Sequence, residues 1–143
     1  MASAKPPSVP QSPGGTGDPS MALSLLRAGD WLKADVFAGR FEGRALGTGI
    51  SVIVFSSEEV GAGPPLHTHP YDEVFIVKEG RAELRIGDTL LTAERGDVVL
   101  GPANVPHAFR NLGPGRLSTT DIHLNADIIQ TDLDEPPFAE SAP

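Results

Sequence analysis

Short runs of β-type sequence, separated by turn residues, dominate the middle of the chain. Residues 81–86 alternate strictly between charged and apolar side chains, as expected for a strand with one buried face. Gly80, Gly87 and Gly96 lie at the ends of such runs and supply the turns. Comparable runs cover residues 50–55, 73–78, 89–93, 97–100, 108–111 and 117–124. Strands this short and this evenly spaced predict an all-β sandwich or barrel.

The pattern weakens toward both ends of the chain. Residues 22–33 fit a short helix or a strand that leads into the domain, and residues 125–133 fit a last helical turn or an edge strand. Residues 1–20 hold five prolines and three glycines and almost nothing to bury, which predicts a disordered tail or leader. Residues 134–143 have the composition of a second tail. We therefore expect a single domain at residues 21–133.

Composition narrows the class of protein. The chain has 143 residues, enough for one domain, and its 16 glycines and 14 prolines favour turns over a helical bundle. It has no cysteine, which excludes disulfides, thiolate catalysis and cysteine-based zinc sites. No apolar run approaches the roughly 20 residues that span a bilayer, and no segment has the form of a secretory signal. We therefore expect no membrane partner and a cytoplasmic location.

The charge pattern bears on partners. The chain has 11 Lys and Arg against 19 Asp and Glu, a net charge of −8. An acidic chain without a basic cluster argues against nucleic acid as a partner. Residues 126–143 contribute −5 of this charge, from five acidic residues and no Lys or Arg. Most of the acidity therefore belongs to the C-terminal end and says little about a substrate pocket.

Three histidines and one glutamate have the spacing of a metal-binding set. His67 and His69 are separated by one residue, Glu73 follows with the same parity, and His107 lies in a later run. Neutral imidazole and carboxylate groups bind divalent transition metals, and four protein ligands leave one or two coordination positions open, which suits catalysis. The alternative is surface histidines on turns. Asp72 competes with Glu73 as the carboxylate ligand, but parity favours Glu73.

The residues around these candidates resemble the two motifs of the cupin family. Residues 61–80 match the first motif at every fixed position: glycine, five residues, His-X-His, three residues, glutamate, six residues, glycine. Residues 96–111 match the second motif except for Asn104, where the family usually has glycine. Asparagine tolerates the left-handed conformation, so we expect that turn to be kept. The resemblance implies a double-stranded β-helix, or jelly-roll barrel, with one metal held by His67, His69, Glu73 and His107, and commonly a homodimer.

Three further residues are candidates for a role near the metal: His123, Asp121 and Tyr71. His123 shares a strand face with Asp121. If that face looks into the barrel, both could support the ligands or act in acid–base chemistry. An outward orientation is the preferred interpretation. Tyr71, the only tyrosine, lies beside the ligands and could contact substrate or pack in the core. Three apolar residues occupy the same alternating positions as the metal ligands and form either a pocket wall or part of the hydrophobic core; these are Phe75, Val77 and Phe109.

Similarity to cupins leaves several functions open, because related sites carry out many reactions. We expect a metal-dependent enzyme acting on a small organic substrate, most similar to dioxygenases of the quercetinase type, with Glu73 doubling as a base. The cofactor would be one divalent transition metal: Fe, Mn, Ni or Zn. The alternatives are a non-redox isomerase or lyase and a non-catalytic protein that binds a small ligand. The complete set of four ligands favours an enzyme.

Overall fold

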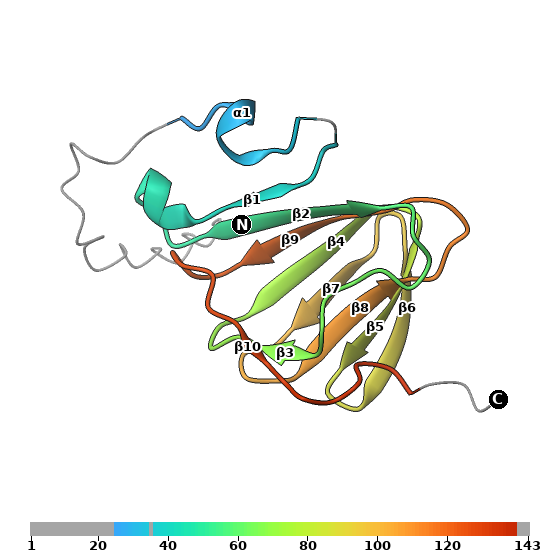
Figure 1. The fold of residues 1–143 in the computed structure, drawn as a ribbon. Coiled ribbons are helices and arrows are strands. Elements are labelled where there is room, and N and C mark those ends of the chain that lie inside the picture. Colours follow the sequence, from blue (N-terminus) through green and yellow to red (C-terminus); the bar gives the residue numbers. More distant parts are fainter. Residues whose placement is uncertain (1–24, 35, 140–143) are drawn as a thin grey trace, which may run out of the picture.

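The computed structural model describes residues 25–34 and 36–139, so the tail expected at residues 1–20 lies outside the described residues. The chain forms two five-stranded antiparallel sheets that face each other (Figure 1). In chain order the elements are α1 (Ala28–Trp31), β1 (Gly39–Phe41), the 3₁₀ helix η2 (Gly43–Leu46), β2 (Ser51–Ser57), β3 (His67–Thr68), β4 (Glu73–Glu79), β5 (Arg81–Ile86), β6 (Thr89–Glu94), β7 (Val98–Gly101), β8 (His107–Asn111), β9 (Leu117–His123) and β10 (Thr131–Asp132).

The strand order confirms the predicted all-β jelly roll. One sheet has the order β1-β2-β9-β4-β7 and the other has the order β10-β3-β8-β5-β6. Each predicted strand is present, with its ends shifted by up to two residues. The segment at 22–33 contributes the short helix α1, and the segment at 125–133 contributes the edge strand β10. The sequence pattern missed β1 and β3, which at three and two residues are too short to show a period.

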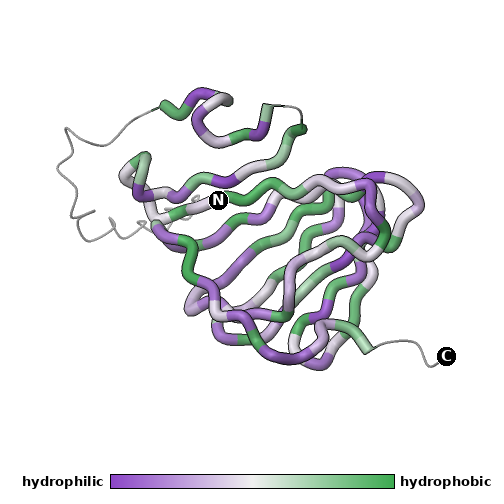
Figure 2. The backbone as a smooth tube through the Cα atoms, viewed as in Figure 1, coloured by the Kyte–Doolittle hydropathy of each residue, from purple (hydrophilic) through white to green (hydrophobic). Residues whose placement is uncertain are grey.

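The core lies between the sheets and follows the strand alternation. Ala82 and Leu84 of β5 are buried, whereas the charged residues that alternate with them, Arg81, Glu83 and Arg85, are more exposed. Figure 2 shows hydrophobic and hydrophilic positions alternating along several strands. Fully burying a leucine such as Leu84 stabilises the fold by about 1.5–3 kcal/mol. The buried cluster consists of Phe75, Val77, Ala82, Leu84, Ala93, Phe109 and Leu117.

The residues that follow β10 pack on the barrel. Phe138 is buried in a second cluster with Leu66 and Ala108. The guanidinium carbon of Arg110 lies 4.3 Å from the centre of the Phe138 ring, a cation–π contact. The composition of residues 134–143 suggested a tail, but the described part of this segment, up to residue 139, covers one end of the sheet that carries β3 and β8.

Asn104 adopts the conformation expected of it. Its φ is +63°, in the left-handed region, and among the described residues other than glycine it alone has a positive φ. Its backbone N–H donates a 2.7 Å hydrogen bond to the carbonyl of His69. The turn therefore joins the second motif to the first, directly beside the metal-binding candidates.

Candidate metal centre

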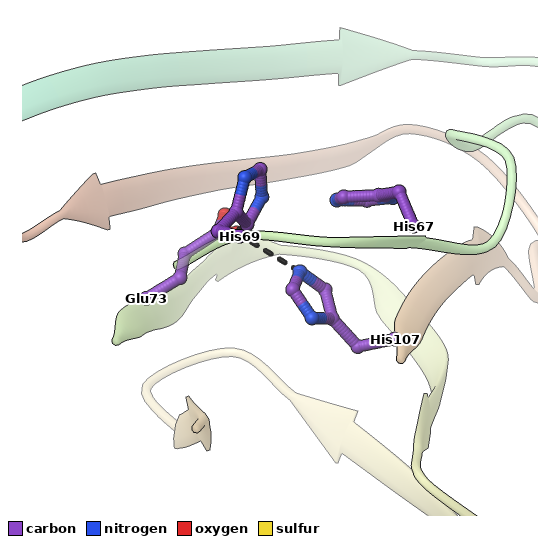
Figure 3. A group of neighbouring side chains, drawn as sticks. All are labelled: His67, His69, Glu73 and His107. Atoms are coloured by element: carbon purple, nitrogen blue, oxygen red, sulfur yellow. Dashed lines mark hydrogen bonds and ion pairs between the residues drawn. The ribbon is translucent and has the colours of Figure 1, made fainter. Parts of the chain in front are cut away.

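The four predicted ligands come together between the two sheets. His67 and His107 are paired directly across β3 and β8, and Glu73 begins β4 in the opposite sheet. His69 follows β3 on the loop that leads to β4. Figure 3 shows the four side chains converging from these elements. One donor atom from each residue lies within 4.8 Å of the others, and all four residues are buried.

Distances around Glu73 match those of ligands on one ion. Its Oε1 atom lies 3.0 Å from His69 Nε2 and 3.1 Å from His107 Nε2. Two donor atoms that bind one ion at about 2.1 Å and at right angles to each other are about 3.0 Å apart. The separations between these side chains therefore already correspond to adjacent coordination positions.

Backbone carbonyls orient the three imidazoles. Nδ1 of His67 donates to the carbonyl of Pro65 at 2.6 Å. Nδ1 of His69 donates to Ile129 at 2.7 Å, and Nδ1 of His107 donates to Val105 at 3.1 Å. In a neutral imidazole, a proton on Nδ1 leaves the lone pair on Nε2. Each ring therefore presents Nε2 as its donor atom, and the hydrogen bonds fix the ring orientation as they do in metal sites.

The electrostatics of the cluster hold two of the four ligands, His67 and Glu73, in the protonation state that binds a metal ion. Burial lowers the pKa of His67 to about 4, so this ring is neutral at neutral pH. Burial acts to raise the pKa of Glu73, but the contacts with His107, His123 and His69 outweigh it and hold the pKa well below its usual range. For His69, burial acts to lower the pKa, but the Glu73 carboxylate and the Ile129 carbonyl outweigh it and raise the pKa.

The residues fit a divalent metal ion. His69 Nε2 is buried and has no hydrogen-bond partner among the described residues, although Glu73 Oε1 is only 3.0 Å away. A buried polar atom without a partner costs about 1–3 kcal/mol, and binding an ion would remove this cost. His67, His69, Glu73 and His107 therefore form a site for one divalent transition metal, with the donor set that Fe, Mn, Ni and Zn all accept.

Asp72 is not part of this group. It is half-buried, and its Oδ1 atom accepts a 2.8 Å hydrogen bond from the backbone N–H of Ala103. This bond ties the loop before β4 to the turn at Asn104. The prediction from parity, that Glu73 and not Asp72 faces the three histidines, is therefore confirmed.

His123 and Asp121 face the interior, so the outward orientation preferred from the sequence is wrong. The exposed fractions of the two residues are 1% and 3%. The register of β9 causes this, because His123 is paired with Glu73 and Asp121 with Phe75, and directly paired residues share a face. Sequence parity showed that the two residues share a face, but only the pairing with β4 decides which face it is.

A chain of contacts joins Tyr71 to the metal-binding group. The Tyr71 hydroxyl accepts a hydrogen bond from the backbone N–H of Ile129 at 3.2 Å and lies 2.7 Å from His123 Nδ1. His123 Nε2 is 3.2 Å from Glu73 Oε2, the carboxylate oxygen that does not contact His69 or His107. The Tyr71 ring also stacks on His69, with centroids 5.0 Å apart. Tyr71 thus contacts both a ligand and the residue behind Glu73.

A cavity of about 240 Å³ opens beside the metal-binding group. Phe75 and Phe109 belong both to the core cluster and to the cavity wall, whereas Val77 belongs to the core alone. Gln130 reaches the cavity from the segment before β10, which no sequence motif indicated. The cavity is lined by Ile53, Phe55, Gly63, Pro64, His67, Glu73, Phe75, Phe109, Asp121, His123 and Gln130.

Comparisons with known proteins agree with this geometry. Residues 54–123 match the family model described as a cupin domain. None of the curated proteins compared with the chain matches it. No helix in the described part of the chain is long and apolar enough to cross a membrane.

Solved structures share the fold at low identity. A mutant of Bacillus subtilis oxalate decarboxylase is 20% identical, with a TM-score of 0.61 over 67% of this chain and 27% of that chain. A Bacillus subtilis oxalate decarboxylase whose Mn(II) centres were assigned is 19% identical, with a TM-score of 0.63 over 75% and 31%. The Lactobacillus farciminis oxalate decarboxylase formate complex is 20% identical, with a TM-score of 0.62 over 73% and 34%. The matched part of this chain thus corresponds to about a third or less of each of these proteins.

The two motifs, the paired sheets and the family model all describe the same segment. The motifs contribute the ligands, the sheets place them between β3, β4 and β8, and the family model covers β4 to β9 without a break. The chain therefore contains a cupin domain at residues 54–123, with a metal-binding group between its two sheets.

Proposed function

We propose that this cupin is a metal-dependent enzyme that acts on a small organic substrate by dioxygenase-like chemistry. The observation that carries the proposal is that two members of the four-ligand group, His67 and Glu73, line a largely apolar cavity, so the group is not enclosed on all sides. A structural metal site is closed by protein ligands, whereas a catalytic site keeps an open position next to space for substrate.

A divalent metal bound by the four ligands would polarise a substrate oxygen and offer a position for O₂. The protein itself orients the substrate and excludes water. Phe55, Phe75 and Phe109 form apolar walls that favour a substrate with an apolar body. Glu73 is ionised, because the surrounding histidines lower its pKa, and it lines the cavity, so it can act as a base.

Tyr71 and His123 supply the remaining acid–base groups in this proposal. The hydroxyl of Tyr71 and the two ring nitrogens of His123 form a path to Glu73 Oε2 with steps of 2.7 and 3.2 Å. His123 also lines the cavity, so it can hold a proton next to a bound substrate. The same path supports a second candidate function, a non-redox isomerase or lyase, in which the metal acts only as a Lewis acid.

Oxygen uptake tests the proposal. Protein loaded with Fe, Mn or Ni should consume O₂ with at least one compound of a panel of catechols, diketones and flavonols. The His107→Ala variant should show no uptake, because it lacks one ligand. If the loaded wild type consumes no O₂ with any member, dioxygenase-like chemistry is contradicted, and proton exchange into the same compounds then tests the isomerase or lyase alternative.

We further propose that the protein forms a homodimer through the outer face of the sheet that contains β7. Val98 and Leu100 are 64% and 51% exposed. Their cross-strand partners Ile76 and Val74 are also apolar, so the exposed residues extend a continuous apolar surface. Val98→Asp should convert a dimer to a monomer in light scattering. Val60→Asp, on a loop and equally exposed at 64%, is the matched control.

A further inference from the structure

One acidic residue lines the cavity without belonging to the metal-binding group. This residue is Asp121 of β9, and Ile53 and Phe55 of β2 line the cavity as well. β2 and β9 are paired so that Ile53 lies directly opposite Asp121. Among the described residues that line the cavity, none is Lys or Arg. A carboxyl group therefore faces the cavity without a cation to neutralise it.

One oxygen of Asp121 also has no partner in the described part of the chain. Only 3% of the residue is exposed, and its Oδ1 atom is buried without a hydrogen bond to any of those residues. A buried hydrogen-bond acceptor or donor that has no partner costs about 1–3 kcal/mol. Such groups are therefore uncommon in stable folds and require an explanation. The explanation that fits this position is a partner that enters through the cavity.

The spacing along β9 sets the size of that partner. Asp121 is two residues from His123 on the same face, a separation of about 6–7 Å along a strand. His123 marks the level of the metal centre, because it lies 3.2 Å from Glu73. A molecule with a chain of four or five carbons, or one ring, spans this distance and fits within about 240 Å³.

We infer that the cavity binds a small, mostly apolar molecule by both ends, with an oxygen of one end at the metal centre and an oxygen of the other end accepting a hydrogen bond from the carboxyl group of Asp121. This inference rests on the proposed function, since it assumes that the metal site faces substrate. It defines the substrate class as a keto or other oxygen-bearing compound that is uncharged at its far end.

Electrostatics support a donor at this position. Burial raises the pKa of Asp121 well above its usual range, whereas the nearby Thr119 hydroxyl acts in the opposite direction and is outweighed. A carboxyl group that keeps its proton donates a hydrogen bond to a carbonyl oxygen. A second carboxylate on the ligand would instead meet Asp121 with no Lys or Arg nearby in the described cavity lining. The site therefore selects against dianions.

Three acids with the same number of non-hydrogen atoms test the inference on the full chain loaded with Zn(II). The probes are 4-oxopentanoate, which has a ketone at the far end; 4-methylpentanoate, which has a methyl group there; and butanedioate, which has a carboxylate. Calorimetry gives the Kd of each for the wild type, Asp121→Leu and Asp121→Asn. Thr120→Val, on the outer face of the same strand, is the control. Metal analysis of each variant precedes the binding measurements.

The decisive measurement is the ratio of the affinities for 4-oxopentanoate and 4-methylpentanoate. We expect Asp121→Leu to lower the preference for the ketone over the methyl compound by about 3- to 10-fold, the contribution of one hydrogen bond. Asp121→Asn keeps a donor, so it should retain most of that preference and bind butanedioate more tightly than the wild type does. Thr120→Val should change neither ratio.

Several outcomes overturn the inference. They are an unchanged ratio in Asp121→Leu, tightest wild-type binding of butanedioate, and no binding of any probe by zinc-loaded protein. If Asp121→Leu does not fold, the inference is overturned when Asp121→Asn binds butanedioate no more tightly than the wild type does. Failure of the wild type to bind zinc instead contradicts the metal site and, with it, the proposed function. Oxygen uptake is not measured here, so failure of the dioxygenase proposal alone leaves this test intact.

Discussion

The cavity has a metal side, formed by the metal-binding group, and an Asp121 side, formed by β2 and β9, and the two differ in how their polar groups are held in place. On the metal side, each of the three ligand histidines donates from Nδ1 to a backbone carbonyl, and Glu73 contacts three imidazoles. On the Asp121 side, this residue presents a buried carboxyl oxygen without a partner among the described residues. The first side is organised in advance for an ion, whereas the second side is completed only by a ligand.

The largest effect is expected from substitutions on the metal side, which should cause loss of the metal. Glu73→Gln and His107→Ala should each lower the affinity for Zn(II) or Mn(II) by about 100-fold or more, because each removes a ligand and not merely a residue behind one. Competition with a chelator measures this. Asp72→Asn is the matched control, since Asp72 adjoins Glu73 but bonds to Ala103. Equal metal affinity in Glu73→Gln and Asp72→Asn would place the ion elsewhere.

The metal side could be predicted from the sequence because its geometry is local. His67, His69 and Glu73 lie within seven residues, and Asn104 keeps its turn in the left-handed conformation that the motif requires. A short segment of strand and loop therefore fixes most of the ligand geometry. Only the placement of His107 requires the pairing of β3 with β8.

The Asp121 side could not be predicted in the same way, because long-range pairing determines it. Parity placed Asp121 and His123 on one face, but the register of β9 between β2 and β4 decides that this face is the interior. Gln130 reaches the cavity, and Phe138 covers β8, only through tertiary packing of the C-terminal segment. These residues show no period or motif from which their positions follow.

Tyr71 supports the metal side, and removing its hydroxyl should have an intermediate effect. Tyr71→Phe keeps the ring that stacks on His69 but removes the contacts with His123 and with the backbone N–H of Ile129. Loss of such supporting contacts lowers metal affinity by about 10-fold. Chelator competition measures the affinity, and thermal unfolding of the metal-free protein measures the structural cost. A lower Tm with unchanged metal affinity would assign Tyr71 to packing alone.

The smallest expected effect has the opposite sign, and it concerns Asp121. Burial raises the folded-state pKa of this carboxyl above the unfolded value of 3.8, so the unfolded chain loses its proton first as the pH rises. The contribution of Asp121 to stability therefore falls as the pH increases above this value. Asparagine does not titrate, so Asp121→Asn should raise the free energy of unfolding of the metal-free protein by about 0.5–2 kcal/mol near neutral pH.

The pH dependence distinguishes this mechanism from a general improvement in packing. Between about pH 4 and pH 7 the gain from Asp121→Asn should grow, because only the wild type carries the penalty of ionising a buried carboxyl. All other titratable groups are common to the two proteins, so the difference between them isolates Asp121. Urea unfolding at the two pH values gives the difference, with Asp88→Asn in the exposed turn between β5 and β6 as control. An equal gain at both pH values would mean that ionisation of Asp121 does not destabilise the fold. A gain that grows with pH would mean that the fold retains Asp121 at a cost to its own stability, as expected of a group kept for a ligand.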